Sequence, residues 1–176
     1  MTRCIHNGVI FNGISQQEEK GAVLIENGVI ADVFSEQRFL QKTFGPDTEI
    51  IDAKGNYILP GLIDTHIHGF KGHGTDECST EGILQMSKDL AHYGVTSFNP
   101  TMYPAPLDQM LDTCKKIVAA IGKEEGAHIM GIHLEGPFIS PEKLGVQKPE
   151  TLQKPSIEVM QKLIDAAEGH IVNMTV

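Results

Sequence analysis

Apolar and polar positions in the first 59 residues follow the pattern of short β-strands. Two β-rich runs, 22–25 and 29–33, flank Glu26-Asn27-Gly28, and an Asn-Gly pair between apolar runs is a strong signal for a β-hairpin. A second hairpin is expected where 49–52 and 57–59 flank Ala53-Lys54-Gly55-Asn56, after an opening strand at 3–11. Residues 1–59 are therefore predicted to form a small antiparallel β-domain, a sandwich.

The pattern changes at Pro60, where strand-like and helix-like runs begin to alternate. Predicted strands are 62–68, 95–99, 129–135 and 171–176. The helices between them begin near Ser79, Pro106 and Ser156, and glycines follow their last apolar positions. A strand–helix alternation of this kind predicts an α/β fold with a parallel sheet, here over residues 60–176.

The last predicted strand is apolar and runs to residue 176. Four strands are half of an eight-stranded (β/α)8 barrel of the TIM type, which typically takes about 250 residues. An open four-stranded α/β sheet is the alternative. Because a terminal apolar strand needs a neighbour or a cover, we expect the first half of a barrel, preceded by the small β-domain.

Charge and cysteine content restrict the classes of partner. The formal net charge is −9 without a basic stripe, which argues against nucleic acid and anionic membranes as partners. Cys4, Cys78 and Cys114 are odd in number and contain no CxxC pair, so disulfide scaffolds and cysteine-rich zinc sites are disfavoured. Without an apolar leader or a membrane-length apolar run, the chain is predicted to be cytoplasmic.

Candidate chemistry begins at the end of the first strand after Pro60. His66 and His68 are two residues apart, so in an extended strand their side chains share one face and can converge on one metal ion. Glu135 ends the third strand of this region, where parallel α/β proteins place functional groups. Together the three residues form a His/carboxylate set suited to zinc or iron. The alternative is a pair of surface histidines and a loop-end carboxylate.

Neighbouring polar residues have less specific roles. His133 shares a face with Glu135, and we expect it to be packed inside the barrel rather than to bind metal. Asp64 could orient a ligand or begin the strand, and Asn99 could line the site. The glycine-rich loop 69–76 matches neither the dinucleotide fingerprint nor the P-loop, and His73 within it is expected in solvent.

These motifs resemble a known family. The stretch 60–69 is similar to the first barrel strand of the metal-dependent amidohydrolase superfamily, and 133–140 (His-Leu-Glu-Gly-Pro-Phe-Ile-Ser) is similar to a motif of the N-acetylglucosamine-6-phosphate deacetylases. The resemblance implies Glu135 as a metal ligand, with His66 and His68 supporting a second metal in members that have one. One or two divalent ions, zinc or iron, are therefore expected.

The resemblance also implies a reaction. Metal-activated water would hydrolyse the N-acetyl group of N-acetylglucosamine 6-phosphate, giving glucosamine 6-phosphate and acetate. It places Val146 and Gln147 in a substrate-contacting loop, although many relatives have a histidine at the position of Gln147. The family's catalytic aspartate is expected beyond residue 176, so this chain alone is expected to be inactive.

Two further readings remain open. Another amidohydrolase, acting on a cyclic amide or a different amino sugar, would share the paired histidines, and a non-catalytic piece could associate with a second copy through its open sheet edge. For the complete enzyme we expect a phosphorylated amino sugar as the substrate and a homo-oligomer, a dimer.

Overall fold

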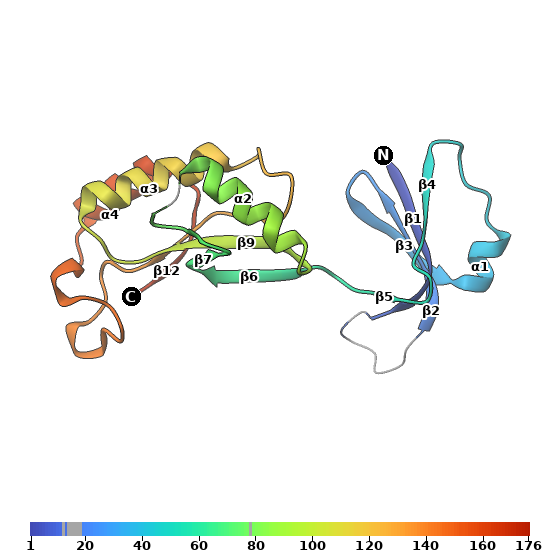
Figure 1. Ribbon diagram of the computed structural model, residues 1–176, viewed down its shortest axis with the longest axis horizontal. Helices are drawn as coiled ribbons and strands as arrows, with labels where there is room; N and C mark the ends of the chain where they lie inside the picture. The colour runs from blue at the N-terminus through green and yellow to red at the C-terminus, as the bar shows by residue number, and fades with distance from the viewer. Residues whose placement is uncertain (12, 14–18, 78) are drawn as a thin grey trace. The chain divides into compact units, whose positions relative to one another are not determined.

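The structure is a computed structural model that describes residues 1–11, 13, 19–77 and 79–176. It divides into two compact units, Met1–Pro60 and Gly61–Val176 (Figure 1). Cys78, one of the three cysteines considered above, lies outside the described residues, whereas Cys4 and Cys114 are buried free thiols.

The first unit is built on one five-stranded sheet. Its strands are β1 (Thr2–Ile10), β2 (Glu19–Glu26), β3 (Val29–Ser35), β4 (Thr48–Asp52) and β5 (Tyr57–Ile58), with the short helix α1 (Glu36–Gln41) after β3. The order is β3-β2-β1-β4, and β5 also pairs with β1. The predicted hairpin at Asn27-Gly28 is confirmed, because Glu26 pairs with Val29 across an antiparallel ladder.

The second predicted hairpin is wrong. β4 and β5 do not pair with each other; both run parallel to β1, with Cys4 opposite Ile50 and Val9 opposite Tyr57. The turn between them is held by β1 itself, since the Ala53 N–H binds the His6 carbonyl at 2.8 Å. The chain therefore continues along β1 instead of folding back. The sheet is mixed rather than antiparallel, and the described strands of this unit form one sheet, against which Phe39 of α1 packs.

The second unit contains the predicted parallel sheet. β6 (Leu62–Ile67), β9 (Val95–Met102), β11 (Ile132–Glu135) and β12 (Ile171–Thr175) are parallel neighbours in chain order. Helices α2 (Thr80–Ala91), α3 (Leu107–Ala120) and α4 (Ile157–Ala166) form a layer over one face of it (Figure 1). Two 3₁₀ turns, η1 (Pro141–Lys143) and η2 (Pro149–Thr151), lie in the loop between β11 and α4.

Sequence signals for the helices agree with the structure. Ser79 Oγ accepts from the Gly82 N–H, and Ser156 Oγ accepts from the Val159 N–H, both at 3.3 Å, so both serines cap helices at the predicted starts. The apolar faces of the helices meet the apolar face of the sheet in one core. Its fully buried members include Ile83, Met86, Phe98, Met102, Met110, Ile117, Ile132, Leu134 and Leu163.

Two other details differ from the predicted elements. The expected strand 129–135 is split into β10 (His128–Ile129) and β11, because Gly131 has φ 152° and a side chain there would lie 2.6 Å from the His170 carbonyl oxygen. The glycine-rich segment after His68 forms a small hairpin of β7 (Gly69–Phe70) and β8 (His73–Gly74), in which His73 is half-buried rather than in solvent.

The helices of the described residues are short. The longest, α3, has 14 residues, and none combines the length and apolar character needed to cross a bilayer.

Candidate metal centre

The candidate site lies on the face of the parallel sheet that the helices do not cover. Side chains alternate along each strand, so Phe98 and Met102 on β9 point into the helix-side core while Asn99 and Thr101 point the other way. His133 and Glu135 on β11 share this second face for the same reason. Strand alternation thus gathers polar side chains from successive strands on one side of the sheet.

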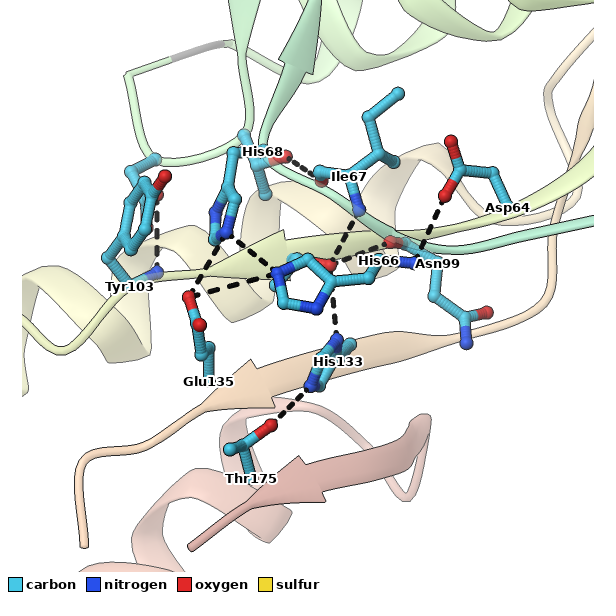
Figure 2. A network of polar contacts seen from close by, with 12 residues as sticks. Asp64, His66, Ile67, His68, Asn99, Tyr103, His133, Glu135 and Thr175 are labelled. Atoms are coloured by element: carbon cyan, nitrogen blue, oxygen red, sulfur yellow. Dashed lines mark hydrogen bonds and ion pairs between the residues drawn. The ribbon is translucent and has the colours of Figure 1, made fainter. Parts of the chain in front are cut away.

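His66, His68 and Glu135 converge on this face (Figure 2). The Nε2 atoms of the two histidines are 3.0 Å apart. Glu135 Oε2 lies 3.1 Å from His68 Nε2 and 3.9 Å from His66 Nε2. One ligand atom from each residue therefore fits within a 4.8 Å cluster, so the arrangement predicted from the sequence could hold a metal ion.

The geometry of the cluster suits a small divalent cation. Two nitrogens bound tetrahedrally to zinc lie about 3.3 Å apart, close to the observed 3.0 Å. Glu135 Oε2 is buried and forms no hydrogen bond to a described residue, although a carboxylate oxygen removed from water needs a partner. A cation among the three atoms would satisfy it, and the mixed nitrogen and oxygen donors suit zinc or ferrous iron.

Burial also keeps the His68 imidazole in the form that binds metal. Burial lowers the pKa of His68, and the neighbouring His66 lowers it further. The charge of Glu135 and the nearby Thr101 carbonyl act in the opposite direction and raise that pKa. The pKa of His133 is lowered by burial and by its neighbour His66. Neutral imidazole is the metal-binding species, so this environment favours occupation over protonation.

Hydrogen bonds from β9 and β12 fix the residues around the cluster. Thr101 Oγ1 accepts from the Ile67 N–H at 2.9 Å, which holds the main chain between the two histidines. His133 is packed, as expected: its Nδ1 lies 3.2 Å from Thr101 Oγ1 and its Nε2 lies 3.0 Å from Thr175 Oγ1. Its ring meets the ring of His66 edge-on at 4.8 Å.

Asp64 and Asn99 have different positions in the site. Asp64 Oδ1 accepts from the His66 N–H at 3.1 Å, so its carboxylate orients the main chain of a candidate ligand rather than the ring. Asn99 is buried, and its Oδ1 has no hydrogen-bond partner among the described residues.

Tyr103 and Asp76 complete the surroundings and were not singled out from the sequence. The Tyr103 ring stacks on His68 with a centroid distance of 3.5 Å and an interplanar angle of 1°. Asp76 Oδ2 accepts from the Tyr103 N–H at 3.3 Å, and burial raises the pKa of Asp76 to about 6. The strand predicted at 95–99 continues to Met102 in the structure, and this extension brings Tyr103 level with His68. A longer predicted strand would have pointed to Tyr103.

A pocket of about 490 Å³ opens beside Tyr103. Its lining includes Asp76, Tyr103 and Gln109, together with the two predicted substrate residues, Val146 and Gln147. Gln147 is buried, whereas Val146 is 89% exposed. The structure thus places both residues at one cavity, and their contact with substrate stays a prediction.

Comparison with known proteins identifies the family. The sequence profile of the amidohydrolase family matches residues 57–175, about two thirds of the chain. The chain belongs to the amidohydrolase family. This amidohydrolase sequence is 34% identical to the N-acetylglucosamine-6-phosphate deacetylase of Bacillus subtilis over 165 residues, which cover 89% of this chain and 40% of that protein.

Other relatives and solved structures agree. The Haemophilus influenzae N-acetylglucosamine-6-phosphate deacetylase is 32% identical over 165 residues, covering 88% of this amidohydrolase chain and 42% of that protein. The crystal structure of the Pasteurella multocida deacetylase superposes with a TM-score of 0.83 at 25% identity, over 100% of this chain and 45% of that one. The Thermotoga maritima deacetylase gives 0.70 at 28% identity, over 90% and 39%. The chain therefore spans less than half the length of these relatives.

Proposed function

We propose that this amidohydrolase chain forms the N-terminal part of an N-acetylglucosamine-6-phosphate deacetylase. The reaction would release acetate from N-acetylglucosamine 6-phosphate and leave glucosamine 6-phosphate. The observation that carries the proposal is the convergence of His66, His68 and Glu135 at 3.0–3.9 Å, in a chain whose curated relatives bear this name.

Each residue of the cluster has a role in the proposal. His66 Nε2, His68 Nε2 and Glu135 Oε2 would hold one or two divalent ions, zinc or iron. A bound ion would polarise the amide carbonyl and lower the pKa of a water molecule. Asp64 and Thr101 keep the main chain of the histidine pair in place through the His66 and Ile67 N–H groups.

The substrate would occupy the pocket beside Tyr103. Val146 and Gln147 line that pocket, and the amide of Gln147 can both donate to and accept from sugar hydroxyls. The aspartate that would carry the proton from water to the leaving amine is not assigned within residues 1–176. We therefore propose that turnover requires residues beyond this chain.

The parallel sheet of the second unit also supports the proposal. Four parallel strands in chain order, with helices on one face, match half of a (β/α)8 barrel, which places functional groups at the carboxyl ends of its strands. Glu135 is the last residue of β11, in agreement with that rule. We propose that residues 60–176 contribute four of eight barrel strands. Assembly as a dimer and a cytoplasmic location remain predictions.

Two measurements test the proposed function. The 176-residue chain, stripped with chelator and dialysed against zinc or ferrous iron, is expected to retain metal, and Glu135→Gln is expected to abolish that retention. The complete gene product is expected to release acetate from N-acetylglucosamine 6-phosphate, and the 176-residue chain is not.

A substrate panel separates the alternatives. It contains N-acetylglucosamine 6-phosphate, its unphosphorylated form, another N-acetylated amino sugar phosphate and a cyclic amide. Hydrolysis of the cyclic amide without deacetylation would assign a different amidohydrolase activity. A metal-free, inactive gene product that sediments as a self-associated species would instead support a non-catalytic protein.

A further inference from the structure

His68 lacks the support that a metal-binding histidine usually has. Such a histidine normally donates its second ring N–H to a carboxylate, a carbonyl or water, which fixes the orientation of the ring. His68 directs Nε2 toward Glu135, whereas its buried Nδ1 forms no hydrogen bond of standard geometry to a described residue, although the Thr101 carbonyl lies near the ring. Another contact must therefore keep the imidazole in place.

Tyr103 supplies that contact. Aromatic rings commonly pack with centroids 4.5–7 Å apart, whereas the Tyr103 and His68 centroids are 3.5 Å apart with the rings parallel to within 1°. Figure 2 shows the phenol lying flat on the imidazole, which comes from the segment after β6. The His66 ring meets His68 at 73° and 5.0 Å. Rotation of the His68 ring out of line with Glu135 would collide with Tyr103.

The main chains of the stacked pair are held by two consecutive residues. The Thr75 N–H binds the His68 carbonyl at 2.7 Å, which closes the β7–β8 hairpin on its own stem. The next residue, Asp76, accepts from the Tyr103 N–H through Oδ2 at 3.3 Å. One turn therefore fixes both His68 and the ring that covers it.

We propose that Tyr103 is a positioning residue for the metal site, and that Asp76 anchors it. The aromatic face of Tyr103 holds the His68 imidazole with Nε2 directed at the cluster, in place of the hydrogen bond that Nδ1 lacks. This role rests on the proposed metal centre. It requires the ring of Tyr103 but not its hydroxyl, which gives the proposal a distinctive pattern of variants.

Metal affinity of the 176-residue chain is the main measurement, made with Zn²⁺ in competition with a chromophoric chelator and with Co²⁺ by its visible absorption. Tyr103→Leu is expected to weaken both affinities about 10- to 100-fold, the usual effect of losing an outer contact to a ligand. Tyr103→Phe keeps the aromatic face and is expected to bind within about twofold of the unmodified chain. Tyr93→Leu is the matched control, because Tyr93 is an exposed tyrosine of the same unit that packs on Phe70.

A metal-free measurement tests the stack directly. The ring protons of His68 are expected to show an upfield ring-current shift in the NMR spectrum of the unmodified chain and of Tyr103→Phe, and to lose it in Tyr103→Leu. Should Tyr103→Leu fail to fold, Tyr103→Met preserves bulk without an aromatic face, and the same losses are expected. Asp76→Ala is expected to weaken metal binding in the same direction, and Asp76→Asn, which retains an acceptor oxygen, is expected to restore it.

Several outcomes would overturn the positioning role. Unchanged metal affinity in folded Tyr103→Leu would do so, as would an equal loss in Tyr103→Phe or in Tyr93→Leu. If the unmodified chain binds neither Zn²⁺ nor Co²⁺, the proposed metal centre fails, and the role of Tyr103 fails with it. If the unmodified chain binds metal and folded Tyr103→Leu binds it with the same affinity, only the positioning role is refuted.

Discussion

Glu135→Gln removes the one negative charge of the His66–His68–Glu135 cluster and keeps the size of the side chain. Glu135 Oε2 lies 3.1 Å from His68 Nε2, and burial lowers the pKa of His68, so without metal the carboxylate faces a neutral ring that the glutamine amide can also contact. In chelator we therefore expect Glu135→Gln to be about as stable as the unmodified chain. Its effect should appear only when metal is added, because the amide oxygen is a neutral and weaker ligand than the carboxylate.

The size of that effect follows from linkage between binding and folding. A free metal concentration about 100 times Kd stabilises the native state by about 2.7 kcal/mol. Loss of one of three converging ligands should exceed the 10- to 100-fold cost typical of an outer contact, so we take about 100-fold as a lower bound. At the same metal concentration the variant would gain only about 0.4 kcal/mol. The difference of about 2.3 kcal/mol corresponds to roughly 5–9 °C in Tm.

The assay is thermal unfolding followed by circular dichroism, with chelator and then with buffered free Zn²⁺. Glu142→Gln is the matched control, because Glu142 is an exposed carboxylate in η1, outside the cluster. We expect Glu142→Gln to keep the full metal-dependent rise in Tm and Glu135→Gln to lose most of it. The role assigned to Glu135 is refuted if its variant rises with Zn²⁺ as much as the unmodified chain.

Three further predictions concern stability. Burial raises the pKa of Asp76 to about 6, so the native state binds more protons than the unfolded state between about pH 4 and 6, and stability falls as pH rises through that window. The unfolding free energy of Asp76→Asn, minus that of the unmodified chain, should therefore increase from pH 4 to pH 7 in urea titrations; a flat difference would contradict this. Thr101→Val removes the side-chain oxygen that accepts from the Ile67 N–H and contacts His133 Nδ1. The free energy of unfolding in urea should therefore fall by about 1–3 kcal/mol. An unchanged free energy would show that these groups find other partners. Leu134→Ala empties a fully buried core position and should cost about 2–5 kcal/mol, against about 0.5 kcal/mol or less for the exposed Leu62→Ala; equal costs would contradict the core assignment.

Local chemistry explains which elements were predictable. Serine caps, the Asn-Gly turn and the apolar faces of α2 and α3 depend on neighbouring residues, so the sequence pattern carries them. The convergence of His66 with His68 follows from strand alternation alone. That Glu135 reaches them depends on the order of parallel strands, which the strand–helix alternation also predicts.

Long-range pairing explains the errors. β4 and β5 have the lengths and turn residues of a hairpin, and only their hydrogen bonds to β1, 46 positions from β4, decide otherwise. The break at Gly131 depends on the approach of His170, just before β12, and of Val172 within it. Tyr103 and Asp76 belong to no motif, and their importance comes from a stacking contact between residues 35 positions apart.

The hydrogen bond from the Thr75 N–H to the His68 carbonyl has a consequence for sequence change in this protein. It makes the segment from Gly69 to Gly74 a closed hairpin loop, in which Gly69 pairs with Gly74. Residues at the tip of this hairpin loop can be added, lost or replaced without displacing the His68 imidazole at its base. The entropic cost of closing a loop grows only slowly with its length. The tip is thus a position where new contacts to other molecules can evolve while the geometry of the three converging side chains is inherited unchanged.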